Sequence, residues 1–345
     1  MRVLVAMSGG VDSSVAAALE LQAGHEVVGA TMKLWGGTSD SGCCSLQDVT
    51  DARRVCDHLG VEHHVFNFTE AFEHHVVDAY ASEHAAGRTP NPCVECNRHL
   101  KFDAFLQRAT RLGFDAIATG HHARVVRSGG EALISRGRDA AKDQSYVLAV
   151  LDRGARASLR LPIGEITKAE VRAIAESLGL RTFAKPDSQD VCFIASKTAR
   201  TAREAFLRER IELHPGVLVD KGSGARVGTT DAIELVTVGQ RRGLRLAVGE
   251  RRYATAVDVE TSTVTVGSEE DLLCTQVLLA QPRVVAHELA EGAEVIVQVS
   301  AHGVPRAARL YSDRVEFDRP GRRVAPGQLV AWYVGQDVIG SAIAR

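Results

Sequence analysis

A segment rich in glycine and serine near the start of the chain has the residue types of a phosphate-binding loop. Ser8–Ser14 (SGGVDSS) follows a short apolar run, Val3–Met7, and leads into a helical pattern. Two glycines allow a tight turn, so that backbone N–H groups and serine hydroxyls can converge on one anion at a helix N-terminus. The segment matches neither Gly-x4-Gly-Lys-Ser/Thr nor the dinucleotide pattern Gly-x-Gly-x-x-Gly. It therefore predicts a cradle for pyrophosphate, with a plain turn whose serine caps the helix as the alternative.

Two cysteines lie in segments rich in proline and polar residues. Cys96 ends the segment TPNPCVEC at 89–96, and Cys192 ends KPDSQDVC at 185–192. We predict that Cys96 begins a helix. Basic residues follow it closely: Arg98, His99 and Lys101. Helix N-termini and nearby cations lower the pKa of a thiol, so this position favours a nucleophilic thiolate, with a small buried apolar side chain as the alternative.

The elements that position these residues alternate between strands and helices. Over the first 195 residues, short apolar runs predict strands at 3–7, 26–32, 63–68 and 114–119, and amphipathic patterns predict helices at 11–21, 46–59, 70–86 and 97–112. Such alternation indicates an α/β fold with a doubly wound parallel sheet. Ligands bind such sheets at the carboxyl ends of the strands, which is where the glycine-rich loop lies.

The character of the sequence changes near residue 210. Short alternating runs separated by glycine-rich turns predict strands at 216–220, 233–238, 253–259, 262–266, 293–299, 306–311 and 329–334. We therefore expect a small β-rich linker domain followed by a C-terminal β-barrel. The predicted domains are residues 1–208, 209–273 and 274–345.

Composition narrows the class of protein. The chain has 345 residues, of which 45% are hydrophobic, and a formal net charge of -2. No apolar run approaches the roughly 18 residues that span a bilayer, and nothing at the start is typical of a signal peptide. We expect a cytoplasmic protein without a membrane partner. Its seven cysteines are too few for a disulfide framework; Cys56 and Cys274 are interpreted as buried, and Cys43 and Cys44 as loop residues.

Ordered blocks of residues extend these motifs along the chain. They are MSGGVDSS at 7–14, TPNPCVECNRHLKF at 89–102, ATGHHAR at 118–124, KDQSY at 142–146, DSQDVCFI at 187–194, VGQRRGL at 238–244 and PGQ at 326–328. Together they resemble the tRNA-specific 2-thiouridylase (MnmA) family of the PP-loop ATP-pyrophosphatase superfamily. This resemblance covers nearly the whole chain.

The resemblance implies a two-step reaction with ATP and Mg²⁺ as cofactors. The 2-carbonyl oxygen of the wobble uridine is adenylated with release of pyrophosphate, and sulfur then replaces that oxygen. The substrates implied are the tRNAs for glutamate, glutamine and lysine, and the sulfur donor is a cysteine desulfurase or a sulfur-relay protein. Cys192 is expected to carry a persulfide, and Cys96 is expected to be the nucleophile that attacks it, leaving a transient Cys96–Cys192 disulfide.

The resemblance also implies which residues bind ATP and which bind tRNA. It implies no metal ligand. The residues implied for ATP are Ala6, Met7, Ser8, Gly9, Gly10, Val11, Asp12, Ser13, Met32 and Gly120. The residues implied for tRNA are Asn91, Pro92, Cys93, His121, Lys142, Asp143, Gln144 and Gln328.

Two alternatives remain open at the level of sequence. Cys93 stands where well-known family members have aspartate, so that Cys93, Cys96 and Cys192 could instead hold a [4Fe–4S] cluster with one open iron, or a zinc ion. A PP-loop ligase that forms an amide or amidine would use the same ATP loop. Such a ligase needs neither the paired loop cysteines nor a C-terminal barrel for RNA.

Overall fold

The computed structural model describes residues 1–35, 45–187, 191–194, 199–244, 246, 251–284, 286 and 289–345. These residues divide into two compact units, which we describe separately. The sheet unit comprises Met1–Val76, Pro92–Lys197 and Gly335–Ile339, and the barrel unit comprises Val77–Asn91, Thr198–Val334 and Gly340–Arg345. None of the described helices is long and apolar enough to cross a membrane. The division into three domains at residues 208 and 273 stays a prediction.

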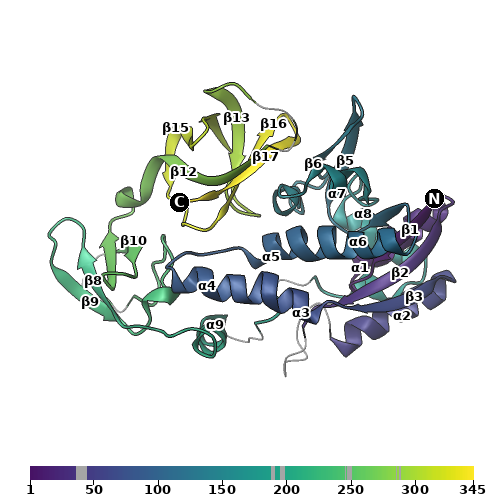
Figure 1. Cartoon of the computed structure of the whole chain (residues 1–345), viewed down its shortest axis with the longest axis horizontal. Helices are drawn as coiled ribbons and strands as arrows, with labels where there is room; N and C mark the ends of the chain where they lie inside the picture. Colours follow the sequence, from purple (N-terminus) through teal and green to yellow (C-terminus); the bar gives the residue numbers. More distant parts are fainter. Residues whose placement is uncertain are drawn as a thin grey trace. The chain divides into compact units, whose positions relative to one another are not determined.

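The sheet unit is built on five parallel strands in the order β3-β2-β1-β4-β7 (Figure 1). They are β1 (Arg2–Ala6), β2 (Glu26–Lys33), β3 (Glu62–Asn67), β4 (Ala116–Ala118) and β7 (Leu159–Arg160). The central strand β1 runs parallel to both β2 and β4. Its residues Val3, Leu4 and Val5 are fully buried, because a strand that is covered on both faces must be continuously apolar.

Helices cover this sheet. One apolar cluster joins Val3 and Val5 of β1 to α1 (Val11–Gln22), α2 (Leu46–Leu59) and α8 (Lys168–Ser177). Leu4 points to the opposite face of the strand and is buried as well.

The shorter elements before residue 199 are α3 (Thr69–Phe72), α4 (Ala79–Ala85), α5 (Pro92–Glu95), α6 (Phe105–Arg111), α7 (Arg153–Ala157), β5 (Ala123–Ser128), β6 (Glu131–Arg136), π-helical segments at Glu73–Asp78 and Cys96–Ala104, and 3₁₀ turns at Tyr146–Leu148 and Arg181–Ala184. The predicted doubly wound α/β fold is confirmed.

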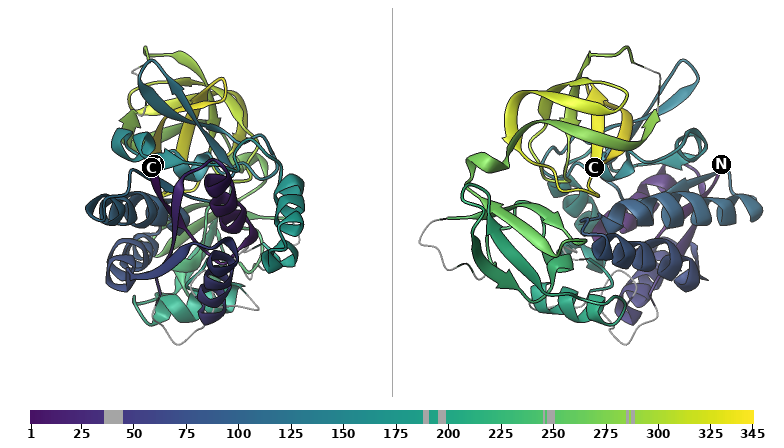
Figure 2. Two further views of the ribbon diagram at one scale, coloured as in Figure 1. Left: turned by 90° about the vertical axis from the view of Figure 1, so that its right-hand side faces the viewer. Right: turned by 60° about the vertical axis from the view of Figure 1, so that its left-hand side comes forward.

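The barrel unit contains two β-structures. After α9 (Ala199–Arg208), the strands β8 (Gly216–Asp220), β9 (Arg226–Thr230), β10 (Tyr253–Asp258) and β11 (Thr263–Gly267) form a small sheet in the order β10-β11-β8-β9. The second structure comprises β12 (Leu273–Val284), β13 (Ala293–Gln298), β14 (Arg306–Leu310), β15 (Arg314–Arg322), β16 (Leu329–Val334) and, from Gly340 on, β17 (Asp337–Ala344). β12 pairs with both β15 and β17, which closes the antiparallel barrel drawn in light green and yellow in Figure 2. The predicted small β-rich domain and terminal barrel are confirmed.

One predicted strand is absent, and the burial of the residues that predicted it explains the error. Residues 233–238 begin with a 3₁₀ turn at Ile233–Leu235 rather than a strand. The side chain of Glu234 is 3% exposed and accepts hydrogen bonds from the backbone and ring nitrogens of His214. The alternation of apolar and polar residues that predicted a half-exposed strand therefore belongs to a turn that is buried on all sides.

Candidate active site

The glycine-rich loop and the turn after β4 meet at the carboxyl edge of the parallel sheet. β1 has β2 on one side and β4 on the other, so the strand order reverses here, and ligands bind at such switch points. A Cβ atom on Gly120, in the turn after β4, would lie 2.6 Å from the backbone nitrogen of Ser13. Glycine therefore allows this turn to pack directly against the first turn of α1.

The loop after β1 is shaped by two glycines and two serines. Gly9 has a positive φ of 71°, and a Cβ atom there would lie 2.3 Å from the carbonyl oxygen of Asp48. Gly10 precedes α1 in an extended conformation, and no side chain in the described part of the chain caps it. The hydroxyls of Ser13 and Ser14 donate to the carbonyl oxygen of Gly10 at 3.1 and 2.8 Å. Since the first N–H groups of a helix have no intrahelical acceptor, this end of α1 is suited to a phosphate group.

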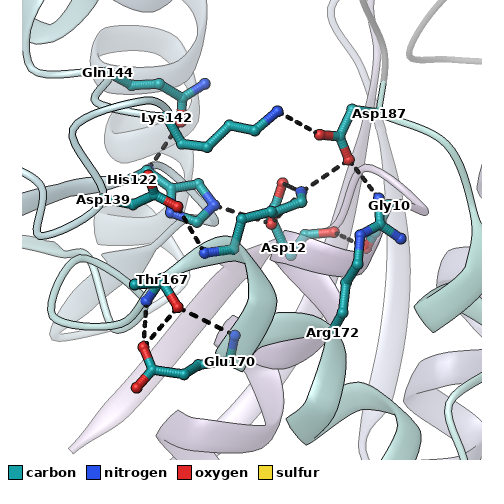
Figure 3. Close-up of polar contacts among 12 residues, drawn as sticks. Gly10, Asp12, His122, Asp139, Lys142, Gln144, Thr167, Glu170, Arg172 and Asp187 are labelled. Carbon is teal, nitrogen blue, oxygen red and sulfur yellow. Dashed lines mark hydrogen bonds and ion pairs between the residues drawn. The ribbon is translucent and has the colours of Figure 1, made fainter.

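Asp12, in the first turn of α1, contacts two basic side chains (Figure 3). Lys168 Nζ lies 2.7 Å from both carboxylate oxygens of Asp12, and His122 Nε2 lies 3.2 Å from Oδ1. Burial by itself raises the pKa of Asp12, but the hydrogen bonds from His122 and Lys168 outweigh burial and hold the pKa below its ordinary value. Asp12 is therefore an ionised carboxylate at neutral pH.

Asp187 joins three cations at the same edge of the sheet (Figure 3). Its carboxylate accepts hydrogen bonds from Lys142 Nζ and from the Arg172 guanidinium, both at 2.8 Å, and pairs with Lys168 Nζ at 3.0 Å. Burial raises the pKa of Asp187, but the hydrogen bonds from Lys142 and Lys168 prevail and lower the pKa to about 2. Lys168 thus bridges two carboxylates, Asp12 and Asp187.

The Lys-Asp-Gln segment that was expected to contact tRNA packs around this network. Asp143 accepts a hydrogen bond from the Arg136 guanidinium at 2.9 Å and is largely buried. The side-chain oxygen of Gln144 accepts from the backbone N–H of His122 at 2.8 Å. Lys142 is partly exposed and holds its charge beside the network, since its pKa is raised by the hydrogen bond with Asp187.

His121 and Met32, which were expected to contact tRNA and ATP, are both largely buried. His121 Nδ1 lies 2.8 Å from the hydroxyl oxygen of Thr119, and its ring lies 5.7 Å from the ring of Phe102. Burial, together with the charges of Lys101 and His122, holds the pKa of His121 well below its ordinary value. The neutral form of His121 therefore predominates at physiological pH. Met32 lies near the end of β2 and is 9% exposed.

The cysteines that were expected to handle sulfur lie in the sheet unit. Cys96 is buried, Cys192 is partly exposed and Cys93 is exposed. The helix begins at Pro92, so that Cys93 lies in its first turn and Cys96 lies one turn further on, where the π-helical segment begins. The prediction that Cys96 begins the helix is therefore wrong. Proline, which lacks an N–H group, is well suited to the first helical position.

An iron–sulfur cluster would require Cys93, Cys96 and Cys192 to lie together as ligands. Among the described residues, which include all three cysteines, no group of three or more His, Cys, Asp and Glu side chains is placed to hold a metal ion. These residues therefore do not fit a cluster with three thiolate ligands. Cys43 and Cys44 lie outside the described residues.

The Pro-Gly-Gln turn of the barrel unit contacts the start of the segment that leads to Cys96. We call this contact, between residues 88–89 and 326–328, the Thr89 junction. The backbone N–H of Thr89 donates to the carbonyl oxygen of Pro326 at 2.7 Å, and Gln328 Nε2 donates to the carbonyl oxygen of Thr89. Gly327 has a φ of 90°, and a Cβ atom there would lie 3.1 Å from the nitrogen of Thr89. Gln328, which was expected to contact tRNA, thus bonds to this segment.

Sequence analysis missed the charged residues that connect this site, above all Lys168, Lys185 and Asp187. A signal exists for Lys168, because Thr167–Glu170 forms a capping box that places Lys168 at the first residue of α8. Lys185 and Asp187 lie in the segment that was selected for Cys192. Their partners are distant in the sequence, so nothing local indicates what they contact.

Comparisons with known proteins cover all parts of the chain. Three family models match in succession: a tRNA methyl transferase HUP domain over residues 1–196, a tRNA methyl transferase PRC-barrel domain over residues 204–268 and an aminomethyltransferase beta-barrel domain over residues 275–344. The tRNA-specific 2-thiouridylase MnmA of Salinispora arenicola is 45% identical over 360 residues, with 99% of this chain and 98% of the relative covered. The protein of the same name from Beutenbergia cavernae is 45% identical, with 99% and 94% covered.

A solved structure is similar over part of the chain. It is a 4-thiouridine synthetase–RNA complex with bound ATP, with 17% sequence identity and a TM-score of 0.38. The similarity covers 60% of this chain and 50% of that chain.

Proposed function

We propose that this chain, which belongs to the family of tRNA-specific 2-thiouridylases, uses ATP to replace the 2-oxygen of the wobble uridine of tRNA by sulfur. The resemblance predicted from the sequence blocks is confirmed by relatives that are 45% identical over 99% of the chain. The alternative of an amide- or amidine-forming ligase is not favoured by these relatives.

One observation carries the proposal: the first turn of α1, with Asp12, lies at the switch point of the sheet without a capping side chain among the described residues. The phosphates of ATP would bind its N–H groups. Mg²⁺ is held by one or two carboxylates together with nucleotide phosphates, and Asp12 is suited to be such a ligand. The ion would offset the charge of the departing pyrophosphate. The proposed ATP-binding residues are Ala6, Met7, Ser8, Gly9, Gly10, Val11, Asp12, Ser13, Met32 and Gly120.

The proposed activation step makes the uridine oxygen a good leaving group. The 2-carbonyl oxygen attacks the α-phosphorus of ATP, the bond from that phosphorus to pyrophosphate breaks, and an adenylated uridine results. AMP can then leave when sulfur attacks carbon 2. The ionised Asp12 and its partner Lys168 lie beside the loop where this charge develops.

The proposed sulfur step uses two thiols in the sheet unit. Cys192 carries a persulfide, and the thiolate of Cys96 attacks its inner sulfur, which releases the terminal sulfur as sulfide. The sulfide displaces AMP from carbon 2, and the Cys96–Cys192 disulfide is then reduced by an external thiol. The exposure of Cys192 supports its role as acceptor, because a sulfur donor must reach it.

The proposed macromolecular partners are tRNA and a sulfur donor. The substrates are the tRNAs for glutamate, glutamine and lysine, and the donor is a cysteine desulfurase or a sulfur-relay protein. The side chains proposed to contact tRNA are Asn91, Pro92, Cys93, His121, Lys142, Asp143, Gln144 and Gln328. Lys142 is the side chain of this set whose exposed charge best suits an RNA phosphate.

The activation step is tested by Asp12→Ala. We expect tRNA-dependent pyrophosphate release to fall by about a thousandfold, or about 4 kcal/mol of barrier. Release is measured with purified tRNA, ATP and Mg²⁺. The matched control is Asp271→Ala in the barrel unit, which removes a partly exposed carboxylate that pairs with Lys221 at 2.7 Å. Normal release by Asp12→Ala would contradict the assignment.

The sulfur step is tested by separate replacement of the two thiols. Cys192→Ser should fail to load a persulfide, whereas Cys96→Ser should load one without delivering sulfur. Both variants should still release pyrophosphate, because the activation step uses neither thiol. Mass spectrometry of the protein and of tRNA nucleosides measures both outcomes, and thiolation by Cys192→Ser would rule out its role as carrier.

A further inference from the structure

The segment that leads to Cys192 is held at the nucleotide-binding edge by charged side chains on both sides. We call residues 183–187 the anchor segment. Arg172 of α8 donates to the carbonyl oxygens of Phe183 and Lys185 at 2.5 and 3.0 Å, and to the carboxylate of Asp187 at 2.8 Å. One guanidinium thus binds every second residue of the segment: Phe183, Lys185 and Asp187.

A second contact runs from the anchor segment directly to the nucleotide loop. Lys185 Nζ donates to the carbonyl oxygen of Gly9 at 3.0 Å, and to the carboxylates of Asp48 and Asp51 at 2.7 and 2.8 Å. The two carboxylates belong to α2, whose N-terminal turn also lies against Gly9. The lysine therefore fixes the anchor segment, the loop and α2 to one another.

A third contact reaches the same loop through Lys168. Asp187 pairs with Lys168 at 3.0 Å, and Lys168 pairs with Asp12 at 2.7 Å. Asp12 and Asp187 are both labelled in Figure 3. The anchor segment thus contacts the nucleotide loop directly at the backbone of Gly9, and it is linked to the carboxylate of Asp12 through Lys168. Gly9 and Asp12 are both among the residues that are proposed to bind ATP.

We propose that Asp187, together with Arg172 and Lys185, is a positioning residue that aligns the persulfide-bearing Cys192 with the activated uridine at the nucleotide-binding edge. The proposal rests on the proposed function, because it assigns the coupling between the two steps of that reaction. Cys192 lies five positions after Asp187 in the sequence, so even a fully extended chain keeps the two within roughly 18 Å. An anchor this close restricts where the persulfide can be delivered.

The chemistry of the contacts supports a positioning role. Ion pairs of partly buried groups add little net stability compared with apolar contacts, because the charges must be desolvated. They do fix direction and distance, and displacement of a reacting group by about 1 Å can cost about a hundredfold in rate. The ionic contacts of the anchor segment end on α2, on α8 or on Lys142, all of which lie at the nucleotide-binding edge.

The test separates activation from sulfur transfer in Asp187→Asn. Pyrophosphate release and 2-thiouridine are both measured on purified tRNA, with ATP, Mg²⁺ and a persulfide donor. We expect pyrophosphate release within about threefold of the unaltered protein, and 2-thiouridine formed per pyrophosphate reduced by about tenfold or more, which corresponds to about 1.4 kcal/mol. Asp187→Glu, which keeps the charge, should restore part of this ratio.

A second sulfur source distinguishes positioning from a general loss of structure. Inorganic sulfide can attack the activated uridine without a persulfide on Cys192, so Asp187→Asn should thiolate tRNA from sulfide at the rate of the unaltered protein. The control Asp271→Asn should leave all rates unchanged. If the unaltered protein releases no pyrophosphate with tRNA, the proposed function fails, and this outcome is distinct from failure of the positioning role.

Two results would overturn the positioning role. One is an unchanged ratio of 2-thiouridine to pyrophosphate in Asp187→Asn. The other is an equal fall in both products, which would mean that Asp187 acts only on activation. Should Asp187→Asn fail to fold, Arg172→Gln gives the same test, because it removes another contact of the anchor segment and leaves the pair of Asp12 and Lys168 in place.

Discussion

Different forces stabilise two regions of the molecule. One is the nucleotide-binding edge of the sheet unit, and the other is the Thr89 junction within the barrel unit. At the edge, the contacts are ion pairs among Asp12, Lys168 and Asp187. At the junction, they are hydrogen bonds to the backbone of Thr89 and close packing against Gly327. Ionic groups can exchange partners when a charged substrate arrives, whereas backbone contacts fix shape. We therefore expect both regions to respond to steric change, and the edge alone to respond to a change of charge.

Among the substitutions that compare the two regions, Gly9→Ala at the edge should have the largest effect. The new Cβ atom would lie 2.3 Å from a backbone oxygen of α2, at a φ of 71° that disfavours alanine, so the loop must move. We expect pyrophosphate release to fall by about a hundredfold, or about 2.7 kcal/mol. Gly24→Ala is the matched control, since its φ is 80° with no atom within 4 Å of a Cβ. Equal activity losses in the two variants would contradict the steric explanation.

Gly327→Ala should have the next largest effect, at the Thr89 junction. The new Cβ atom would lie 3.1 to 3.2 Å from backbone atoms of Thr89, at a φ of 90°. We expect 2-thiouridine formation to fall by about tenfold while ATP affinity stays unchanged, because the junction belongs to the barrel unit and the nucleotide loop to the sheet unit. The control is Gly224→Ala, with a φ of 70° and open space. A weaker ATP affinity in Gly327→Ala would break the distinction between the two regions.

Gln328→Ala should have a smaller effect, and its kinetics sharpen the role of the junction. Loss of the hydrogen bond to the carbonyl oxygen of Thr89 leaves the backbone contact with Pro326 intact. We expect kcat for thiolation to fall by about fivefold, because Gln328 positions the segment at Thr89, and KM for tRNA to rise, because Gln328 is also proposed to contact tRNA. Steady-state kinetics measure both. A change confined to KM would contradict the positioning role of Gln328.

The smallest expected effect is on stability in acid, and it tests the ionic character of the edge. The pKa of Asp187 is about 2 in the folded chain, below its ordinary value of 3.8, so its ion pairs stabilise the fold above pH 4 and lose this contribution as the pH falls toward 2. Asp187→Asn should therefore lower stability to urea by about 0.5 kcal/mol at pH 6, since solvent screens these partly exposed pairs, and by less than half of that near pH 2. A difference that does not depend on pH would contradict the ionic explanation.

The chemistry of the site was largely predictable, because it depends on local residue types. Glycines and serines between a strand and a helix predict a phosphate loop whatever the rest of the chain does, and the same blocks predicted the family. The connections within the site were not predictable. Lys185 contacts Gly9 from 176 residues away, and Gln328 contacts Thr89 from 239 residues away. Such pairs leave no periodic signal in one sequence.

The sequence alone determined the parallel sheet, the terminal barrel, the phosphate loop and the cysteine segments, since hydrophobic period, turn residues and helix caps act over a few neighbouring residues. Only the tertiary structure decided that the helix begins at Pro92, that residues 233–238 form no strand and that Asp187 links Lys142, Lys168 and Arg172. The physical reason is that burial and ion pairing depend on which distant segments pack together, and a local pattern of residues carries no information about them.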